Sequence, residues 1–479
     1  MNRIVSMLAA CAASAVMLWF GTGLQPVWWL TWLAPLPVLW VAPRLSAAGA
    51  FGLATLAWAA GAANEWNYAH RLLEMPLPII AIMVLAPSLV FGVAVLLWHR
   101  LLLRGALLQA ALAFAGVIVS FGFAQQRLSP HSTWGDIAYS QMDFLPVLQT
   151  ASLAGVAGVA FLLLFLPASL AAAWWGPGPS RHRWAVAGGA VLLLVLAVGW
   201  GALRLGETPG QQVKVGLIAS DLLKNLSPKD PERKKALFAG YSAKAGELIA
   251  QGAQLVIVPE KLARVADADI ADVDLPFQQA AAQGAVIVVG LERWSAGNKL
   301  NESRIYGPQG TLWATYEKHH MLPAFEGDML VGTTRTVFDQ PSGKWGVAIC
   351  KDLDFPRLSR EYGNDGIGLL VVSAWDFVAD AWLHDRMAVM RGVESGFSLA
   401  RSSKDGLLSL SDDRGRVLAQ ARAQTGTGAD EFYTLLGEVP VHHDATLYAR
   451  WGDWFSWLML AGLVLILLNT LRSAAPAKT

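Results

Sequence analysis

The sequence predicts a membrane protein that carries one α/β domain between its membrane helices. Hydrophobic residues make up 54% of the chain, charged residues only 15%, and there are 21 tryptophans. Charged residues are scarce in the first 200 positions and dense from 211 to 440. This composition is typical of a membrane protein with an extramembrane domain, and a net charge of +1 gives no sign of nucleic-acid binding.

Eight apolar segments are long enough to cross a bilayer, seven before the charged region and one after it. Their rough limits are 4–22, 26–43, 46–64, 77–98, 105–124, 147–175, 183–203 and 453–471. We therefore expect a seven-helix transmembrane domain over 1–205, an extramembrane domain over 211–440 and a C-terminal transmembrane helix over 453–471. Leu8-Ala-Ala-Cys11 is similar to a lipoprotein cleavage box, but the apolar stretch continues past Cys11, so we expect an uncleaved first helix.

The basic residues of the short loops predict the orientation. With the N-terminus in the cytoplasm, eight of these basic residues are cytoplasmic and three lie outside. This orientation agrees with the excess of lysine and arginine that cytoplasmic loops carry. The eight are Arg3, Arg44, Arg100, Arg104, Arg181, Arg183, Arg472 and Lys478, and the three are Arg71, Arg127 and Arg204. An odd number of spans then places 211–440 outside the cytoplasm.

Within 211–440, apolar β-branched runs alternate with amphipathic stretches, which predicts a buried sheet with helices on its faces. We expect strands at 213–218, 255–258, 285–290, 345–350 and 368–373, and a late hairpin formed by 407–411 and 416–420. Helices are expected at 232–252 and 376–397.

Three chemically active side chains stand at the ends of apolar runs: Glu260, Lys318 and Cys350. Strand ends of β-α-β sheets meet along one edge, so these residues can converge. Together they would form one acyl-transfer site. The carboxylate would take the thiol proton, the thiolate would attack a carbonyl, and the ammonium would stabilise the oxyanion. Taken singly, they can also be a surface carboxylate, a solvated loop lysine and a buried structural cysteine.

A metal site is not expected. The chain has only two cysteines. Its histidine pairs, His319-His320 and His442-His443, are adjacent in sequence, and adjacent histidines rarely face the same metal ion. No glycine-rich phosphate loop is present either, and we expect no cofactor.

Glu260, Lys318 and Cys350, with their flanking residues, resemble the nitrilase or carbon–nitrogen hydrolase superfamily. Pro259-Glu260 is similar to its base motif, and Lys318 with Glu326 to its lysine motif with a second glutamate. Cys350 followed by Phe355-Pro356 is similar to its nucleophile elbow. The resemblance covers about 211–440 and implies an α-β-β-α sandwich, acyl transfer through a Cys350 thioester, and a supporting role for Glu326.

The membrane half narrows the resemblance. The loop 133–141 and the segment 149–161 are similar to parts of the bacterial apolipoprotein N-acyltransferase family. That family implies transfer of a fatty acyl chain from a phospholipid donor to the N-terminal amine of a diacylglyceryl-cysteine lipoprotein. It also implies a monomer in the bacterial inner membrane with its catalytic domain on the periplasmic side.

Two other functions remain open: a membrane-tethered amidase that uses the same triad with water as acceptor, and a catalytically inactive binding or scaffold protein. The family usually has Tyr-Glu after the nucleophile, where this chain has Lys351-Asp352, and a lysine there would lower the thiol pKa if it pointed inward. Arg391 and Glu394, spaced i and i+3, are expected to form a structural pair. Candidates for the wall of the cleft are Asn301, Trp375, Met329 and Leu330.

Overall fold

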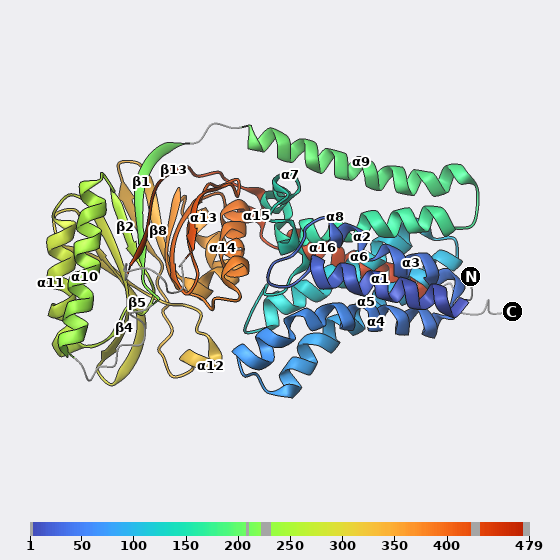
Figure 1. Cartoon of the computed structure of the whole chain (residues 1–479). Helices are drawn as coiled ribbons and strands as arrows, with labels where there is room; N and C mark the ends of the chain where they lie inside the picture. Colours follow the sequence, from blue (N-terminus) through green and yellow to red (C-terminus); the bar gives the residue numbers. More distant parts are fainter. Residues whose placement is uncertain (1–2, 207–209, 222–230, 423–431, 473–479) are drawn as a thin grey trace. The chain divides into compact units, whose positions relative to one another are not determined.

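The structure, a computed structural model, describes residues 3–206, 210–221, 231–422 and 432–472 of the 479-residue chain. The chain divides into two compact units, Met1–Gly206 with Trp451–Thr479, and Glu207–Arg450 (Figure 1). Each unit is described below by itself.

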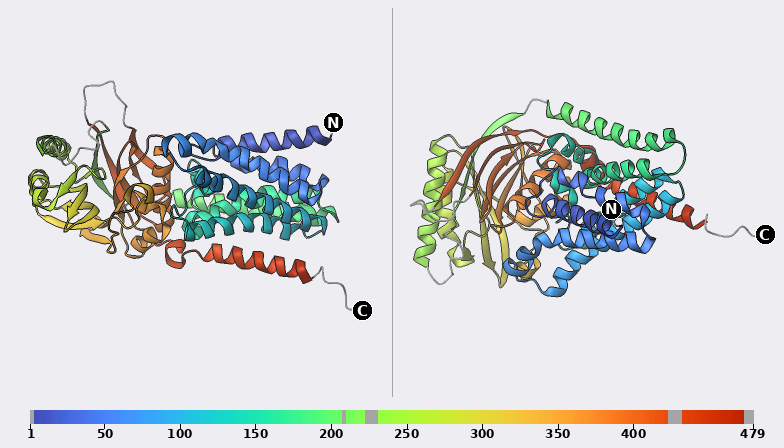
Figure 2. Two further views of the ribbon diagram at one scale, coloured as in Figure 1. Left: turned by 90° about the horizontal axis from the view of Figure 1, so that it is seen from below. Right: turned by 45° about the vertical axis from the view of Figure 1, so that its right-hand side comes forward.

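The first unit is entirely helical in its described part, and its long helices run alongside one another (Figure 2). Six of its helices are long and apolar enough to cross a membrane. They are α1 (Arg3–Gly21), α5 (Leu77–Leu103), α6 (Leu107–Leu128), α8 (Ala151–Trp175), α9 (Ser180–Leu205) and α16 (Trp454–Arg472).

The expectation of eight membrane helices is therefore supported at six positions. The single helix expected at 26–43 is wrong: this stretch forms two short helices, α2 (Leu30–Leu33) and α3 (Leu36–Val41), and a 3-10 turn, η1 (Ala42–Arg44). Proline removes a backbone donor and disfavours helix in the residue before it, and three prolines lie at positions 35, 37 and 43. The expected span 46–64 forms α4 (Ala47–Ala62), whose 16 residues reach about 24 Å, less than the roughly 30 Å hydrocarbon core.

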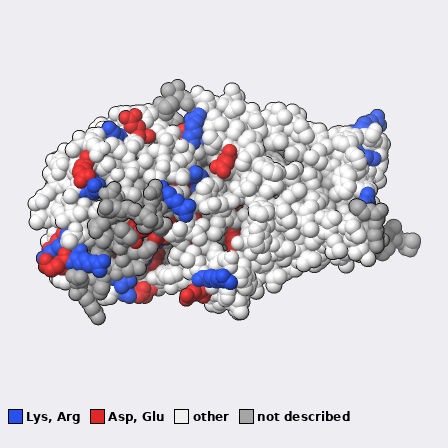
Figure 3. All heavy atoms as spheres, in the orientation of Figure 1, with Lys and Arg blue, Asp and Glu red and all other residues white. Residues whose placement is uncertain are grey.

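Shorter elements complete the helical unit. These are η2 (Ala63–Glu65), the π-helical turn η3 (Tyr68–Leu72), η4 (Ile137–Gln141) and α7 (Leu145–Leu148). Large apolar side chains on the long helices remain exposed, for example Leu8 at 63%, Ile82 at 66% and Leu203 at 75%. Charged side chains are few on the face of this unit shown in Figure 3, except at one end, whereas both signs are spread over the other unit. An exposed apolar surface of this extent is typical of helices that face lipid.

The second unit contains two sheets. One has the strand order β13-β1-β2-β4-β5-β6, with β3 paired to β4, and the other has the order β12-β11-β10-β9-β8-β7. The bounds in the first sheet are β1 (Gln211–Ala219), β2 (Leu255–Val258), β3 (Arg264–Ala266), β4 (Val286–Ser295), β5 (Asn298–Tyr306), β6 (Leu312–Glu317) and β13 (Tyr433–Val441). Those in the second are β7 (Thr336–Gln340), β8 (Gly343–Ile349), β9 (Leu369–Trp375), β10 (Ser398–Lys404), β11 (Leu407–Ser411) and β12 (Val417–Arg422).

Alternating side chains build two apolar layers around the first sheet. Val215 and Leu217 of β1 face the second sheet in one core, while Ile218 packs with residues of α10 (Pro231–Ala250) and α11 (Ile270–Ala281) in the other. Helices α13 (Pro356–Asn364) and α14 (Ala381–Ser395) lie against the second sheet, as Figure 1 shows. The unit is thus an α-β-β-α sandwich, as the resemblance implied. Its remaining elements are η5 (Asp267–Asp269), α12 (Pro323–Glu326), η6 (Cys350–Asp354) and α15 (Leu447–Trp451).

The strands expected from apolar runs are all present, and β2 has the expected bounds. The expected helix 376–397 begins only at Ala381, because β9 continues to Trp375 and a turn follows. The strands without an expectation include β5 and β10, whose sequences are polar although most of their side chains are buried. The Arg391–Glu394 pair on α14 is confirmed, with Nη1 and Oε2 3.2 Å apart and both side chains fully buried.

Candidate active site

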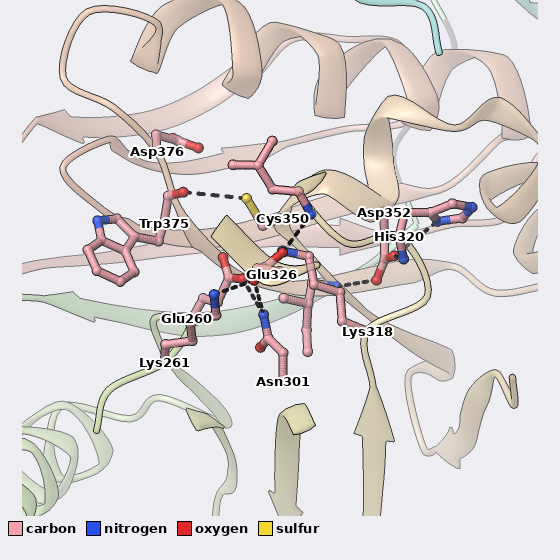
Figure 4. Close-up of polar contacts among 12 residues, drawn as sticks. Glu260, Lys261, Asn301, Lys318, His320, Glu326, Cys350, Asp352, Trp375 and Asp376 are labelled. Atoms are coloured by element: carbon pink, nitrogen blue, oxygen red, sulfur yellow. Dashed lines mark hydrogen bonds and ion pairs between the residues drawn. The ribbon is translucent and has the colours of Figure 1, made fainter. Parts of the chain in front are cut away.

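The sandwich brings the ends of four strands to one place (Figure 4). Glu260 follows β2, Lys318 follows β6, Cys350 follows β8, and Trp375 ends β9. Two bonds link the sheets here: Ser373 Oγ donates to the Val258 carbonyl at 2.8 Å, and the Glu260 amide donates to the Ala374 carbonyl at 3.3 Å. The side chains predicted from strand ends therefore project from a rigid edge, as a site that positions reacting groups requires.

Glu260, Lys318 and Glu326 form one buried polar cluster. The Lys318 ammonium lies 2.8 Å from Glu260 Oε1 and 2.8 Å from Glu326 Oε2. Asn301, on β5, donates to both carboxylates at 2.6 and 2.8 Å. Burial alone would lower the pKa of the Lys318 ammonium, but Glu260 and Glu326 outweigh it and hold the pKa well above its usual range. Lys318 is thus a fixed positive charge, suited to stabilise an oxyanion.

Glu326 is held more tightly than a loop carboxylate. Its Oε2 also accepts from the Leu322 amide at 2.8 Å, and its Oε1 contacts the Lys261 ammonium. Burial would raise the pKa of Glu326, but Lys318 and Lys261 overcome this effect and lower it to about 2. Glu326 therefore stays ionised at any working pH and serves as an anchor for the two lysines.

Cys350 sits on a sharp turn directly after β8. Its φ is 43°, a left-handed backbone conformation that non-glycine residues rarely adopt and that is common at functional sites. The thiol donates to the Trp375 carbonyl at 3.5 Å. Burial raises the pKa of the Cys350 thiol well above its usual range, and Glu260 and Asp376 raise it further, against the opposing effects of Lys318 and Arg401. The resting sulfur is consequently a thiol, which needs a base to become a nucleophile.

Asp352 ties the cysteine turn to the lysine strand. Its fully buried carboxylate accepts from the His319 and His320 amides at 3.0 and 2.9 Å, from the Tyr316 hydroxyl at 2.7 Å and from the Ile349 amide at 3.0 Å. Because these donors come from both sides of the site, Asp352 sets the position of Lys318 relative to Cys350.

Lys351 lies close to the nucleophile in sequence but is paired elsewhere. Its ammonium is 2.8 Å from Asp354 Oδ2, and it also lies over the Phe355 ring. The conditional expectation that Lys351 lowers the thiol pKa therefore receives no support, since its charge is directed to Asp354.

Asp376, which follows Trp375 next to the thiol (Figure 4), belongs to a second charged cluster. Asp376 receives two bonds from the buried Arg401 guanidinium, at 2.9 and 2.5 Å, and one from Ser403 Oγ at 2.9 Å. His384 Nδ1, on α14, lies 3.6 Å from Asp376 Oδ1 and 3.2 Å from Asp380 Oδ1. These pairs hold the Trp375–Asp376 backbone, and with it the carbonyl that accepts from the thiol.

The four cleft candidates fall at different depths. Asn301 is buried between the two glutamates, and Trp375 is half-buried, with its indole donating to Asp405 Oδ2 at 2.9 Å. Met329 is half-buried and Leu330 is 48% exposed on the loop that follows α12. The structure thus places Asn301 and Trp375 at the site and leaves Leu330 on the surface nearby.

Sequence reasoning missed several residues of the site. Lys261, Asp376 and Arg401 were not expected there, although Lys261 directly follows Glu260 and Asp376 follows a strand end. Arg401 is a lone arginine in a buried strand, which is itself a sign of an internal ion pair. In the described parts of the chain, no group of three or more His, Cys, Asp or Glu side chains is arranged to hold a metal ion.

Two family models match this chain in sequence order. The apolipoprotein N-acyltransferase N-terminal domain matches residues 14–169, and the carbon-nitrogen hydrolase model matches residues 229–429. The first match lies in the helical unit, and the second contains Glu260, Lys318 and Cys350.

Several individual proteins are similar to this chain. The chain is 27% identical over 371 residues to an apolipoprotein N-acyltransferase of Geobacter metallireducens, covering 70% of this chain and 69% of that one. It is 23% identical over 468 residues to the Haemophilus ducreyi apolipoprotein N-acyltransferase, covering 89% and 90%. Among solved structures, an amidase from Nesterenkonia sp. AN1 matches 51% of this chain and 95% of its own, with 18% identity and a TM-score of 0.42. Both models lie in order on one chain and the relatives match along most of its length, so the comparisons support membership of the apolipoprotein N-acyltransferase family.

Proposed function

We propose that this protein moves a fatty acyl chain from a phospholipid, through a thioester on Cys350, to the N-terminal amine of a diacylglyceryl-cysteine lipoprotein. The observation that carries the proposal is the buried pairing of Lys318 with Glu260 and Glu326 at the strand edge where Cys350 stands. The described part of the same chain contains six candidate membrane helices.

The first half-reaction forms the thioester. Glu260 takes the thiol proton as the sulfur attacks the ester carbonyl, forming a carbon–sulfur bond and an oxyanion that Lys318 stabilises. Collapse of this intermediate breaks the carbon–oxygen bond, and the departing lysophospholipid oxygen takes the proton from Glu260. The high pKa of the thiol makes this base necessary.

The second half-reaction transfers the acyl group. The free α-amine attacks the thioester carbonyl, the carbon–sulfur bond breaks, and the proton lost by the nitrogen passes through Glu260 to the sulfur. The products are an amide and the original thiol. Water in place of the amine would give a free fatty acid, which is the amidase-like alternative; the named relatives do not favour it.

Entry of the donor needs an apolar surface next to the site, because each methylene drawn into water costs about 0.8 kcal/mol. The loop around α12 offers one: Phe325 is 56% exposed, Leu330 48% and Val331 56%. Glu326, in the same segment, is a member of the buried cluster. We infer that these side chains contact the acyl chain or the lipid surface as the donor enters.

The decisive experiment is intact mass measurement of the full-length protein after exposure to phospholipid vesicles. We expect an added acyl mass that a diacylglyceryl-cysteine peptide removes faster than buffer alone does. Cys350→Ala should show no added mass. Absence of an acyl-enzyme in the unaltered protein would contradict the proposal, and discharge by water at the same rate as by the peptide would favour the hydrolase.

We further propose that the protein is a monomer in the bacterial inner membrane, with residues 211–440 in the periplasm. Labelling of single introduced cysteines in a Cys11→Ala, Cys350→Ala background tests the orientation. An impermeant maleimide should react with Lys244→Cys in intact spheroplasts, and with Gly178→Cys only after permeabilisation. Equal labelling of both positions in intact spheroplasts would contradict the orientation.

A further inference from the structure

Lys261, the residue after the proposed base, has an unusual backbone and a buried ion pair. Its φ is 47°, in the left-handed region that side-chain-bearing residues rarely occupy. The Lys404 ammonium donates to its carbonyl at 2.8 Å. The Lys261 ammonium contacts Glu326 Oε1, and the two side chains are only 13% and 2% exposed.

Burial separates this contact from an ordinary surface ion pair. Exposed lysine–glutamate pairs contribute little and tolerate loss of either partner. A buried pair behaves differently, because removing one partner leaves the other charge desolvated and uncompensated. Glu326 has no water-exposed side to relieve such a loss.

The charges of the cluster balance only when Lys261 is counted. Glu260 and Glu326 carry two negative charges, and Lys318 and Lys261 carry two positive charges. Without Lys261, two carboxylates would compete for the single ammonium of Lys318. The cluster next to Cys350 would then carry one net negative charge, which disfavours the thiolate.

From this geometry we propose that Lys261 is a positioning residue: it neutralises Glu326, so that the Lys318 ammonium remains available to Glu260 and to the oxyanion. The inference rests on the proposed acyl-transfer function and adds a role for a residue outside the triad. The low pKa of Glu326, to which Lys318 and Lys261 both contribute, agrees with it. Cys350, whose titration the test follows, also faces Asp376 and Arg401, and Lys404 and the Lys299–Asp328 pair lie near Lys261.

The test measures the pH dependence of Cys350 alkylation by iodoacetamide in the full-length protein, with peptide mapping to separate Cys350 from Cys11. Lys261→Gln removes the charge and should move the midpoint of reactivity upward by about one pH unit. Lys261→Arg keeps the charge and should stay within a few tenths of a unit of the unaltered protein. Lys244→Gln, which breaks an exposed pair with Glu247 on α10, is the matched control and should show no shift.

A second variant and a double variant that restores the charge balance keep the test from depending on whether a single variant folds. Glu326→Gln leaves one net positive charge and should lower the midpoint, while Lys261→Gln/Glu326→Gln is neutral and should return it toward the unaltered value. The proposal is overturned if Lys261→Gln leaves the midpoint unchanged, if Lys261→Arg shifts it as far as Lys261→Gln does, or if the double variant has the same midpoint as Glu326→Gln. Because alkylation needs no lipid, failure of the unaltered protein to form an acyl-enzyme would count against the proposed function and not against the role of Lys261.

Discussion

The Lys318 ammonium lies 2.8 Å from Glu260 Oε1, and the two side chains are only 2% and 3% exposed. The proposed base and the proposed oxyanion stabiliser are thus in direct contact before any substrate enters. Such a pair is expensive to break, because each partner would be left as a buried, unpaired charge. The Glu260 and Lys318 side chains are accordingly held in place by the ion pair itself.

We predict that Glu260→Gln, Lys318→Met and Cys350→Ala each lower the rate of acyl transfer by roughly 10³-fold or more. Residues that act as one unit are not additive, so the Glu260→Gln/Cys350→Ala double variant should be no slower than Cys350→Ala alone. Single-turnover rates with a phospholipid donor measure this. Near-normal activity of Cys350→Ala would exclude the thioester.

Glu326→Gln should slow thioester formation or its discharge by roughly tenfold or more, because the amide cannot anchor two ammonium groups. Separate mass measurements of the two half-reactions show which step is affected. If both steps proceed at the normal rate, Glu326 has no supporting role.

Asp352→Asn should lower both stability and activity. Its buried carboxylate accepts from four groups on two sides of the site, and an amide leaves some of those donors unsatisfied. We expect a loss of about 2–4 kcal/mol, visible as a lower melting temperature. Asp339→Asn, at an exposed position of β7, should change stability by less than about 0.5 kcal/mol.

His384 should make stability fall in alkaline solution. Burial would lower its pKa, but Asp380, Asp376 and Asp354 outweigh this and raise it to about 9. Protonated His384 therefore stabilises the folded state. This contribution is complete below the unfolded pKa near 6.5 and is lost as the pH rises through about 9. The difference in melting temperature between the unaltered protein and His384→Gln should therefore be largest near pH 6 and shrink above about pH 9.

A matched variant controls for the loss of any histidine from this unit. His443→Gln should leave the pH dependence of melting unchanged, since His443 lies outside the cluster around Asp376. A His384→Gln difference that stays constant between pH 6 and 10 would contradict the assignment of charge to His384.

The exposed apolar loop should matter for lipid substrates only. Met329→Asp/Leu330→Asp should reduce transfer from vesicles by roughly tenfold or more, because charges at these positions would be costly to bring to acyl chains. Acylation by a water-soluble short-chain thioester should change little. Val337→Asp, at an exposed position of β7, serves as the control, and equal loss with both kinds of donor would argue for a folding defect instead.

Features that depend on local sequence pattern could be predicted without the structure. Apolar runs of strand length identified β2, β4, β8 and β9, and the residues that follow such runs included Glu260 and Cys350. Composition identified the membrane unit, because lipid-facing helices need long apolar stretches whatever their partners are. Polar strands such as β5 escaped detection. Their buried Glu302 and Arg304 pair with each other, and also with Arg293 and Asp274 respectively, which the local pattern does not reveal.

Which charged side chains meet depends on how the elements pack, so it emerged only from the folded structure. The contact of Lys261 with Glu326 and the two hydrogen bonds from Arg401 to Asp376 join residues far apart in the chain. Periodicity reports which face of an element is buried, but not which side chain lies opposite it on another element. The electrostatic balance around Cys350 is a sum over such pairs, so it arises when the two sheets pack and cannot be read from any single segment.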